Sequence, residues 1–204
     1  MKKIFVLAAM VAMMVANDCS AGLIVRNSID GANPGVFSPF TAGQETGANV
    51  SAEGIGRVGV SGDNAANAYR TGSWNVAALD TGRYVTFTIT PTAGYAIDFS
   101  SFTYSGSATG SGPTSAAFRS SADGFTSNLG AASVAGATID LSTLTKVTST
   151  IEFRLYAWGA KNQSGTMGID SFSFQGGVSA VPEPSALLLV GSVLGCGFMR
   201  RLRG

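Results

Sequence analysis

Residues 84–91 read Tyr-Val-Thr-Phe-Thr-Ile-Thr-Pro, and this stretch decides the fold class. Val85, Phe87 and Ile89 alternate with three threonines. Successive side chains of a strand point to opposite faces of its sheet. A period of two therefore predicts a half-buried antiparallel strand whose apolar face covers a core. Proline has no N–H to donate to a ladder, so we expect this strand to end at Pro91.

Similar short runs recur along the rest of the chain, separated by segments rich in Gly, Ser, Asn and Asp, which favour turns. They cover residues 96–104, 115–120, 138–141, 150–158 and 168–174. In the run 168–174, Phe172 and Phe174 fall on the same face of the expected strand. No amphipathic helix lies between the runs, so we expect an all-β fold, an antiparallel, jelly-roll-like β-sandwich.

The expected domain is a body over residues 22–178, which is best defined between residues 74 and 176. Its first part, residues 22–73, is less regular, with one expected strand at 54–60 and much loop elsewhere.

Composition excludes several classes of function. The chain has no histidine, which removes the usual serine and cysteine triads and most zinc sites. Between residues 22 and 181 eight basic side chains face ten acidic ones, and no basic stripe is present. Nucleic-acid binding depends on neutralised phosphates, so we expect no nucleic-acid partner. Both cysteines, Cys19 and Cys196, lie outside this body.

Residues 1–21 have the three regions of a secretory signal peptide. Two lysines come first, an apolar run from Ile4 to Ala16 follows, and small residues complete it. Cys19 and Ala21 lie three and one residues before a cut after Ala21, where we expect cleavage. Cleavage before Cys19, as in a lipoprotein, is the alternative. It would put Asp18 where a small residue is required.

Residues 179–204 form a second terminal signal. Fifteen apolar or small residues, 185–199, predict a short transmembrane helix of about 22 Å, less than the hydrocarbon core of about 30 Å. The basic end would remain in the cytoplasm and leave the body outside. An ordinary single-pass tail anchor is one interpretation of this segment. The tail contains, in order, the triplet Pro182, Glu183 and Pro184, the apolar run, and the arginines Arg200, Arg201 and Arg203.

This tail resembles the PEP-CTERM sorting signal of Gram-negative bacteria. The resemblance implies that an exosortase cuts near the triplet, so that the protein contacts the membrane only transiently. The protein would pass through an inner-membrane intermediate to the cell envelope or the extracellular matrix. Residues 74–176 are also similar to the body of many PEP-CTERM proteins, in segments 79–91, 117–125, 153–156 and 168–174. The similarity of the body implies a protein without a catalytic role. The sorting signal implies an association with exopolysaccharide, because exosortase systems often accompany such polymers.

Three aromatic residues are candidates for carbohydrate contact, because aromatic faces stack on sugar rings: Trp74, Tyr156 and Trp158. Tyr156 and Trp158 share a parity on one strand, opposite to Phe153 and Leu155. The alternative is that these rings belong to the core, as most aromatic side chains of a sandwich do.

Three acidic residues are candidates for a calcium site, since calcium prefers oxygen ligands: Asp123, Asp140 and Asp170. The alternative is that Asp123 caps a turn while the other two are exposed. We expect no other cofactor. A glycoside hydrolase would need two carboxylates in a cleft, and no spacing selects such a pair.

Overall fold

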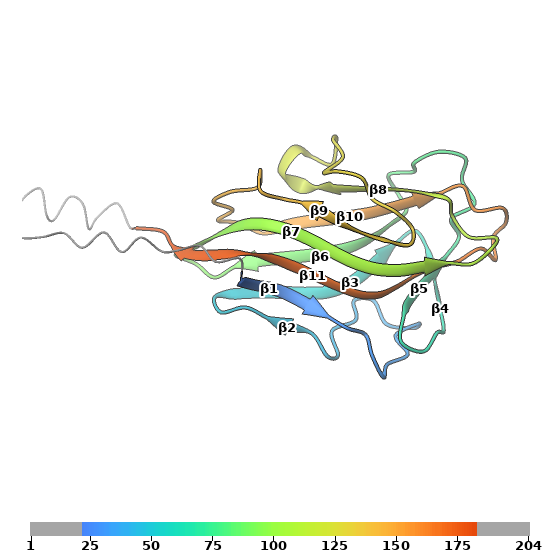
Figure 1. The fold of residues 1–204 in the computed structure, drawn as a ribbon, viewed down its shortest axis with the longest axis horizontal. Coiled ribbons are helices and arrows are strands. Elements are labelled where there is room, and N and C mark those ends of the chain that lie inside the picture. Colours follow the sequence, from blue (N-terminus) through green and yellow to red (C-terminus); the bar gives the residue numbers. More distant parts are fainter. Residues whose placement is uncertain (1–21, 183–204) are drawn as a thin grey trace, which may run out of the picture.

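The computed structural model describes residues 22–182, which form an all-β structure of antiparallel strands with one short 3-10 turn, η1 (Ser121–Asp123) (Figure 1). The all-β expectation is therefore confirmed. The expected signal peptide, the cut after Ala21, residues 183–204 and the helices expected at both termini lie outside the described residues.

A larger sheet is organised around β11 (Met167–Ala180), the chain's last described strand. One side of β11 pairs with β7 (Tyr95–Ala108) along its whole length, and β7 then pairs with β9 (Gly136–Asp140). The other side pairs with β1 (Gly22–Asn27) and, further along, with β5 (Tyr69–Gly72). Two short strands complete this sheet, β2 (Glu45–Thr46) beside β1 and β4 (Ser61–Asp63) beside β5.

A smaller sheet has four strands in the order β3-β6-β10-β8. They are β3 (Val50–Val58), β6 (Tyr84–Pro91), β8 (Ser115–Ser120) and β10 (Ile151–Trp158). From β6 to β11 each connection takes the chain from one sheet to the other. Strands that follow one another in sequence therefore lie in different layers, and both faces of the core are built from the same stretch of chain.

The core between the sheets is an aromatic cluster with Phe174 of β11 at its centre. Its ring centroid lies 4.3 Å from that of Phe102, on the same sheet, and 4.9 Å from that of Phe153, on the other. Phe102 in turn stacks across the interface on Phe118, at 4.4 Å. Offset and edge-to-face pairs of this kind add about 0.5–1.5 kcal/mol each to the burial of the rings.

Most of the expected strands appear with small changes of length. The run at 84–91 is β6, with Val85, Phe87 and Ile89 all buried as its alternation predicted. The clearest differences lie at the two ends of the body. The strand expected at 168–174 extends to Ala180, past the expected end of the body at residue 178. The vague region 22–73 contributes β1 to β5 rather than a single strand among loops.

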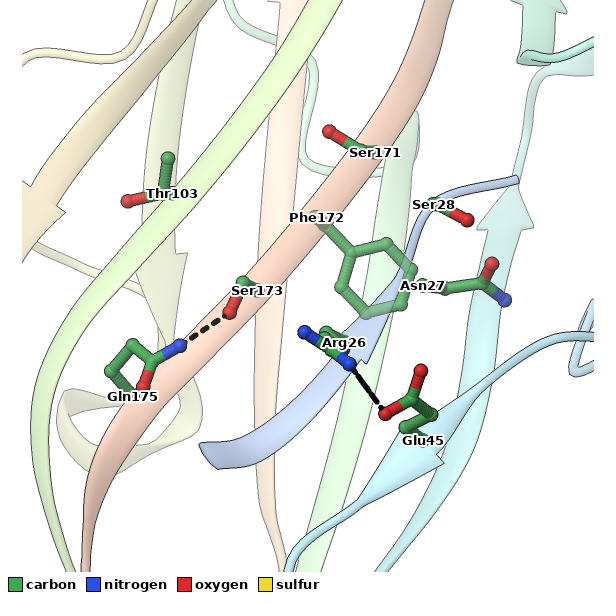
Figure 2. A pocket seen from close by; sticks show the side chains of 9 residues that line it. All are labelled: Arg26, Asn27, Ser28, Glu45, Thr103, Ser171, Phe172, Ser173 and Gln175. Carbon is green, nitrogen blue, oxygen red and sulfur yellow. Dashed lines mark hydrogen bonds and ion pairs between the residues drawn. The ribbon is translucent and has the colours of Figure 1, made fainter. Parts of the chain in front are cut away.

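Simple alternation fails at one point of β11. Ile169 and Phe172 are both buried although they are three residues apart, because the register with β7 shifts between Ile169 and Ser171. A second shift follows between Gln175 and Gly176. Bulges of this kind re-aim side chains. As a result Ser171, Ser173 and Gln175 come to lie on the outer face of the larger sheet (Figure 2).

The two ends of the described chain lie at the same end of the molecule (Figure 1). Gly22 pairs with Gly176, and Ala180 pairs with Tyr95 at the start of β7. The backbone N–H of Val181 still donates to the carbonyl of Gly94, at 2.8 Å. The fold is thus hydrogen-bonded up to one residue before Pro182.

The aromatic core generates a first prediction. Phe174→Ala removes the central ring and leaves a cavity, so the free energy of unfolding should fall by about 3–5 kcal/mol. Phe174→Leu keeps an apolar side chain but loses the ring pairs, so its cost should lie between those of the wild type and Phe174→Ala. Urea denaturation measures both. The matched control is Phe37→Ala, because Phe37 is 55% exposed; it should cost less than about 1 kcal/mol. Equal losses for Phe174→Ala and Phe37→Ala would contradict the assignment of Phe174 to the core.

Candidate functional site

A polar hollow of about 430 Å³ lies on the outer face of the larger sheet, over β1, β2, β7 and β11 (Figure 2). Phe172 is the one apolar lining residue, and its ring is buried in the core against Phe87; the other lining residues are polar or charged. The lining residues are Arg26, Asn27, Ser28, Glu45, Thr103, Ser171, Phe172, Ser173 and Gln175.

The register of the sheet places the polar residues in rows that run across the strands. In the main row Thr138 of β9 pairs with Thr103, Thr103 with Ser173, Ser173 with Arg26, and Arg26 with Glu45. One row therefore crosses five strands and contains only hydroxyl or charged side chains. Paired residues sit on the same face of the sheet, about 4.5–5.5 Å apart.

Hydroxyl groups on neighbouring strands contact one another on this face. The Oγ atoms of Ser105 and Ser171 are 2.7 Å apart, and the Oγ1 atoms of Thr103 and Thr138 are 3.0 Å apart. The amide of Gln175 donates from Nε2 to Ser173 Oγ at 2.8 Å, as Figure 2 shows. A hydroxyl donates one hydrogen bond and accepts two, so each of these groups keeps capacity for a ligand.

One side of the hollow carries an ion pair of zero net charge. Arg26 donates from Nε and Nη2 to the same oxygen of Glu45, at 3.1 and 2.7 Å (Figure 2). Both side chains are more than half exposed, at 56% and 57%. Exposed pairs add about 0.2–1 kcal/mol to stability, so this pair is not needed to hold the fold. It presents a donor and an acceptor side by side at the rim of the hollow.

The adjoining turn is held by the buried side chain of Asn27. Its Nδ2 donates to the carbonyl of Ala42 at 2.9 Å, and its Oδ1 accepts the N–H of Ile29 at 2.8 Å. Ile29 is buried with a φ of +55°, in the left-handed region that a β-branched residue rarely adopts. Such a conformation costs about 1–3 kcal/mol, and it persists here because packing and the Asn27 hydrogen bonds determine it.

The aromatic residues expected to contact carbohydrate do not form a binding platform. Trp74 is fully buried, and its Nε1 donates to the carbonyl of Thr71 at 3.1 Å. Tyr156 does lie opposite Phe153 and Leu155, yet it too is fully buried. Trp158, at the end of the same strand, is half-buried. Stacking on a sugar needs an open ring face, so the expectation is wrong for Trp74 and Tyr156.

Tyr156 is buried because other side chains cover the outer face of the smaller sheet. The Arg119 guanidinium lies 5.8 Å from the centroid of its ring, and the ring of Tyr84 packs edge-on at 5.7 Å. Arg154 lies 4.2 Å from the Tyr84 centroid and 3.7 Å from that of Phe125. Its guanidinium is also held by Glu152, at 2.8 and 3.0 Å. This cation–π cluster closes the face on which a sugar was expected.

The three acidic residues expected to bind calcium do not come together. Within residues 22–182 there is no group of three or more Asp, Glu, His or Cys side chains suited to hold a metal ion. Asp123 follows β8 and accepts hydrogen bonds from the N–H groups of Thr126 and Ser127, at 3.2 and 2.8 Å. Asp140 at the end of β9 similarly accepts the N–H of Ser142, and Asp170 lies on β11. The alternative that Asp123 caps a turn is the one observed.

Sequence reasoning missed the residues that line the hollow, although one signal was present. The alternation at 168–174 separates Ser171 and Ser173 from the two phenylalanines, which marks a polar strand face. What joins Arg26 and Glu45 to that face is the pairing of β1 with β11, and residues 22–46 contain no comparable alternation.

The chain matches no family model, no curated protein and no solved structure with which it was compared. Among residues 22–182 no helix is long and apolar enough to cross a membrane.

The Asp123 turn predicts a pH dependence of stability. Desolvation raises the pKa of Asp123, but the hydrogen bonds from Ser127 and Thr126 outweigh it, so the pKa lies below its ordinary value of 3.8. A lowered pKa means that the carboxylate stabilises the fold above about pH 3.8 and loses this effect as the pH falls through the folded-state pKa. The difference in urea midpoint between the wild type and Asp123→Ala should therefore shrink as the pH falls from 7 to below 3.8. A difference independent of pH would contradict this assignment.

Proposed function

We propose that this chain is an exported, non-catalytic protein of the cell envelope or extracellular matrix, whose body binds a surface polysaccharide at the polar hollow. The observation that carries the binding site is the row of hydroxyl and charged groups that crosses five strands. The export and sorting of the protein rest on its terminal sequences.

The lining of the hollow suits a hydroxyl-rich ligand. A sugar presents groups that both donate and accept, and Ser171, Ser173 and Thr103 offer the same capacity in return. Gln175 adds an amide, and the Arg26–Glu45 pair adds a donor and an acceptor without net charge. Polar groups held in fixed positions orient a bound ligand and provide specificity.

The same residues support binding rather than hydrolysis. Glycoside hydrolysis uses two carboxyl groups about 5–10 Å apart, one of them a general acid. Glu45 is the only carboxylate among the nine lining residues, and it is paired with Arg26. The hollow therefore has no second carboxyl group for this mechanism.

The strand pairings and the chain ends support the rest of the proposal. The pairings β1–β11, β7–β11, β7–β9, β6–β10 and β8–β10, with alternating layers from β6 onward, favour a jelly-roll-like body. β11 leads directly to Pro182, so the Pro-Glu-Pro triplet follows the folded body with almost no linker. Cleavage there by an exosortase would release residues 22–182 nearly whole.

Polysaccharide binding is tested by Thr103→Val, which removes one hydroxyl from the main row and keeps the β-branched shape. The ligand is the exopolysaccharide fraction of the cells that make the protein, cast into native gels for affinity electrophoresis. Loss of one or two hydrogen bonds should weaken binding about 3- to 10-fold. Arg26→Ala should weaken it by a similar factor.

The matched control is Thr88→Val, the same change on β6, in the smaller sheet. It should be retarded as strongly as the wild type. No retardation of the wild type, or equal losses for Thr103→Val and Thr88→Val, would overturn the binding site.

Sorting is tested by the intact mass of the protein from medium and from membranes, with and without a functional exosortase. We expect a released species that begins at Gly22 and ends within residues 182–184, and that disappears without the exosortase. A membrane-bound species that retains Arg203 in both strains would identify a tail-anchored protein instead.

A further inference from the structure

The loop between β1 and β2 exposes apolar side chains that the fold does not bury. Phe37 is 55% exposed, and its neighbour Val36 is 73% exposed. Among residues 22–182 Phe37 is the only exposed aromatic side chain. Every other phenylalanine of the described chain except Phe125, which is half-buried, lies in the core. Exposed apolar surface that is grouped rather than scattered marks a binding surface.

The backbone beneath Phe37 is fixed, so the ring is presented on a rigid support. The carbonyl of Phe37 accepts hydrogen bonds from Arg57 Nη1 at 2.8 Å and from the hydroxyl of Tyr69 at 3.2 Å. The Arg57 guanidinium also lies over the buried ring of Tyr69, 5.5 Å from its centroid. Three residues on, Phe40 exchanges backbone hydrogen bonds with Ile55 of β3, at 2.8 and 3.1 Å. A site held in this way loses little conformational entropy when a ligand binds.

A second hollow, of about 230 Å³, opens beside this ring, and it is lined by Phe37, Pro39, Phe40, Thr41 and Ala42. The rings of Phe37 and Phe40 are tilted at 44°, with centroids 6.4 Å apart. Pockets that enclose a drug-sized ligand measure about 300–1,000 Å³. This hollow is smaller, so it suits one ring of a longer molecule, and Thr41 adds a polar residue to its aromatic lining.

The second hollow adjoins the polar hollow on the larger sheet. Ala42 lines the second hollow, and its carbonyl accepts the amide hydrogen bond of Asn27, which lines the first. Three residues further along, Glu45 lines the polar hollow again. The segment 42–45 therefore connects the linings of the two hollows, and the Asn27–Ala42 hydrogen bond joins a lining residue of one to a lining residue of the other.

We propose that Phe37 forms an apolar subsite of the same saccharide site: its ring stacks on the face of one sugar unit while the polar hollow binds the hydroxyl groups of units further along that chain. This inference rests on the proposed function. It assigns the ligand to polymers whose sugars have an apolar ring face. A protein partner would need about 800 Å² of surface on each side, and a lipid surface would need a basic amphipathic face. Phe37, Val36 and the small hollow offer neither.

The experiment compares Phe37→Ala, Phe37→Trp and Val36→Ala in native gels containing the exopolysaccharide of the producing cells. Phe37→Ala should weaken retardation roughly tenfold, because the stacking surface is lost. Phe37→Trp keeps an aromatic face and should restore binding to within about twofold of the wild type. Val36→Ala is the control, since it removes exposed apolar surface beside the hollow without changing its lining. Thermal unfolding verifies that each variant is folded.

The subsite would be overturned if the Phe37→Ala variant is retarded like the wild type while Thr103→Val loses binding. The proposed function would then still stand. Equal losses for Val36→Ala and Phe37→Ala would overturn it as well, because a general apolar surface would explain them. Two further outcomes would overturn the subsite if Phe37→Ala keeps its polysaccharide binding. Loss of self-association on a sizing column in this variant would assign the ring to a contact with a second copy. Loss of binding to phosphatidylcholine vesicles would assign it to lipid. If the wild type itself is not retarded, the proposed function fails and the subsite with it.

Discussion

The structure depends on the stacking of phenylalanine rings between its two sheets. Phe174 lies within 6.4 Å, centroid to centroid, of rings on both layers, and Phe102 and Phe118 stack directly across the interface. The body has few charges and no disulfide within residues 22–182 to staple it, so apolar burial must offset the conformational entropy of folding. Large rings supply the most buried area per residue, which explains why most of the phenylalanine rings lie in this core.

The outer faces of the two sheets differ in how far other side chains cover them. On the smaller sheet the outer face is closed by Arg154, Arg119 and the rings of Tyr84 and Phe125, which bury Tyr156. On the larger sheet the outer face is open and polar, and its hydroxyls form rows because the strands are in register. The larger sheet therefore presents rows of accessible hydrogen-bonding groups on its outer face.

One segment of the chain takes part in the fold and in the lining of both hollows. Asn27 is buried, and its amide joins the turn after β1 to the loop before β2. That loop carries the exposed Phe37, and it leads into Glu45 at the start of β2. An aromatic face beside a polar surface is the combination that a sugar polymer requires, since each sugar ring has an apolar face and a hydroxyl-bearing edge.

The sequence by itself determined the six strands from β6 to β11, but not the strands of residues 22–73. The alternation at 84–91 places Val85, Phe87 and Ile89 in the core, because side-chain direction along a strand is a local property. It also separates the polar Ser171 and Ser173 from Phe172 and Phe174. Only the tertiary structure decided which polar face is open. Three outcomes depend on pairings between strands that are far apart in the chain. They are the burial of Trp74 and Tyr156, the separation of the three aspartates, and the pairing of Arg26 with Ser173. Local periodicity carries no information about such pairings, because they are selected by the free energy of packing the whole molecule.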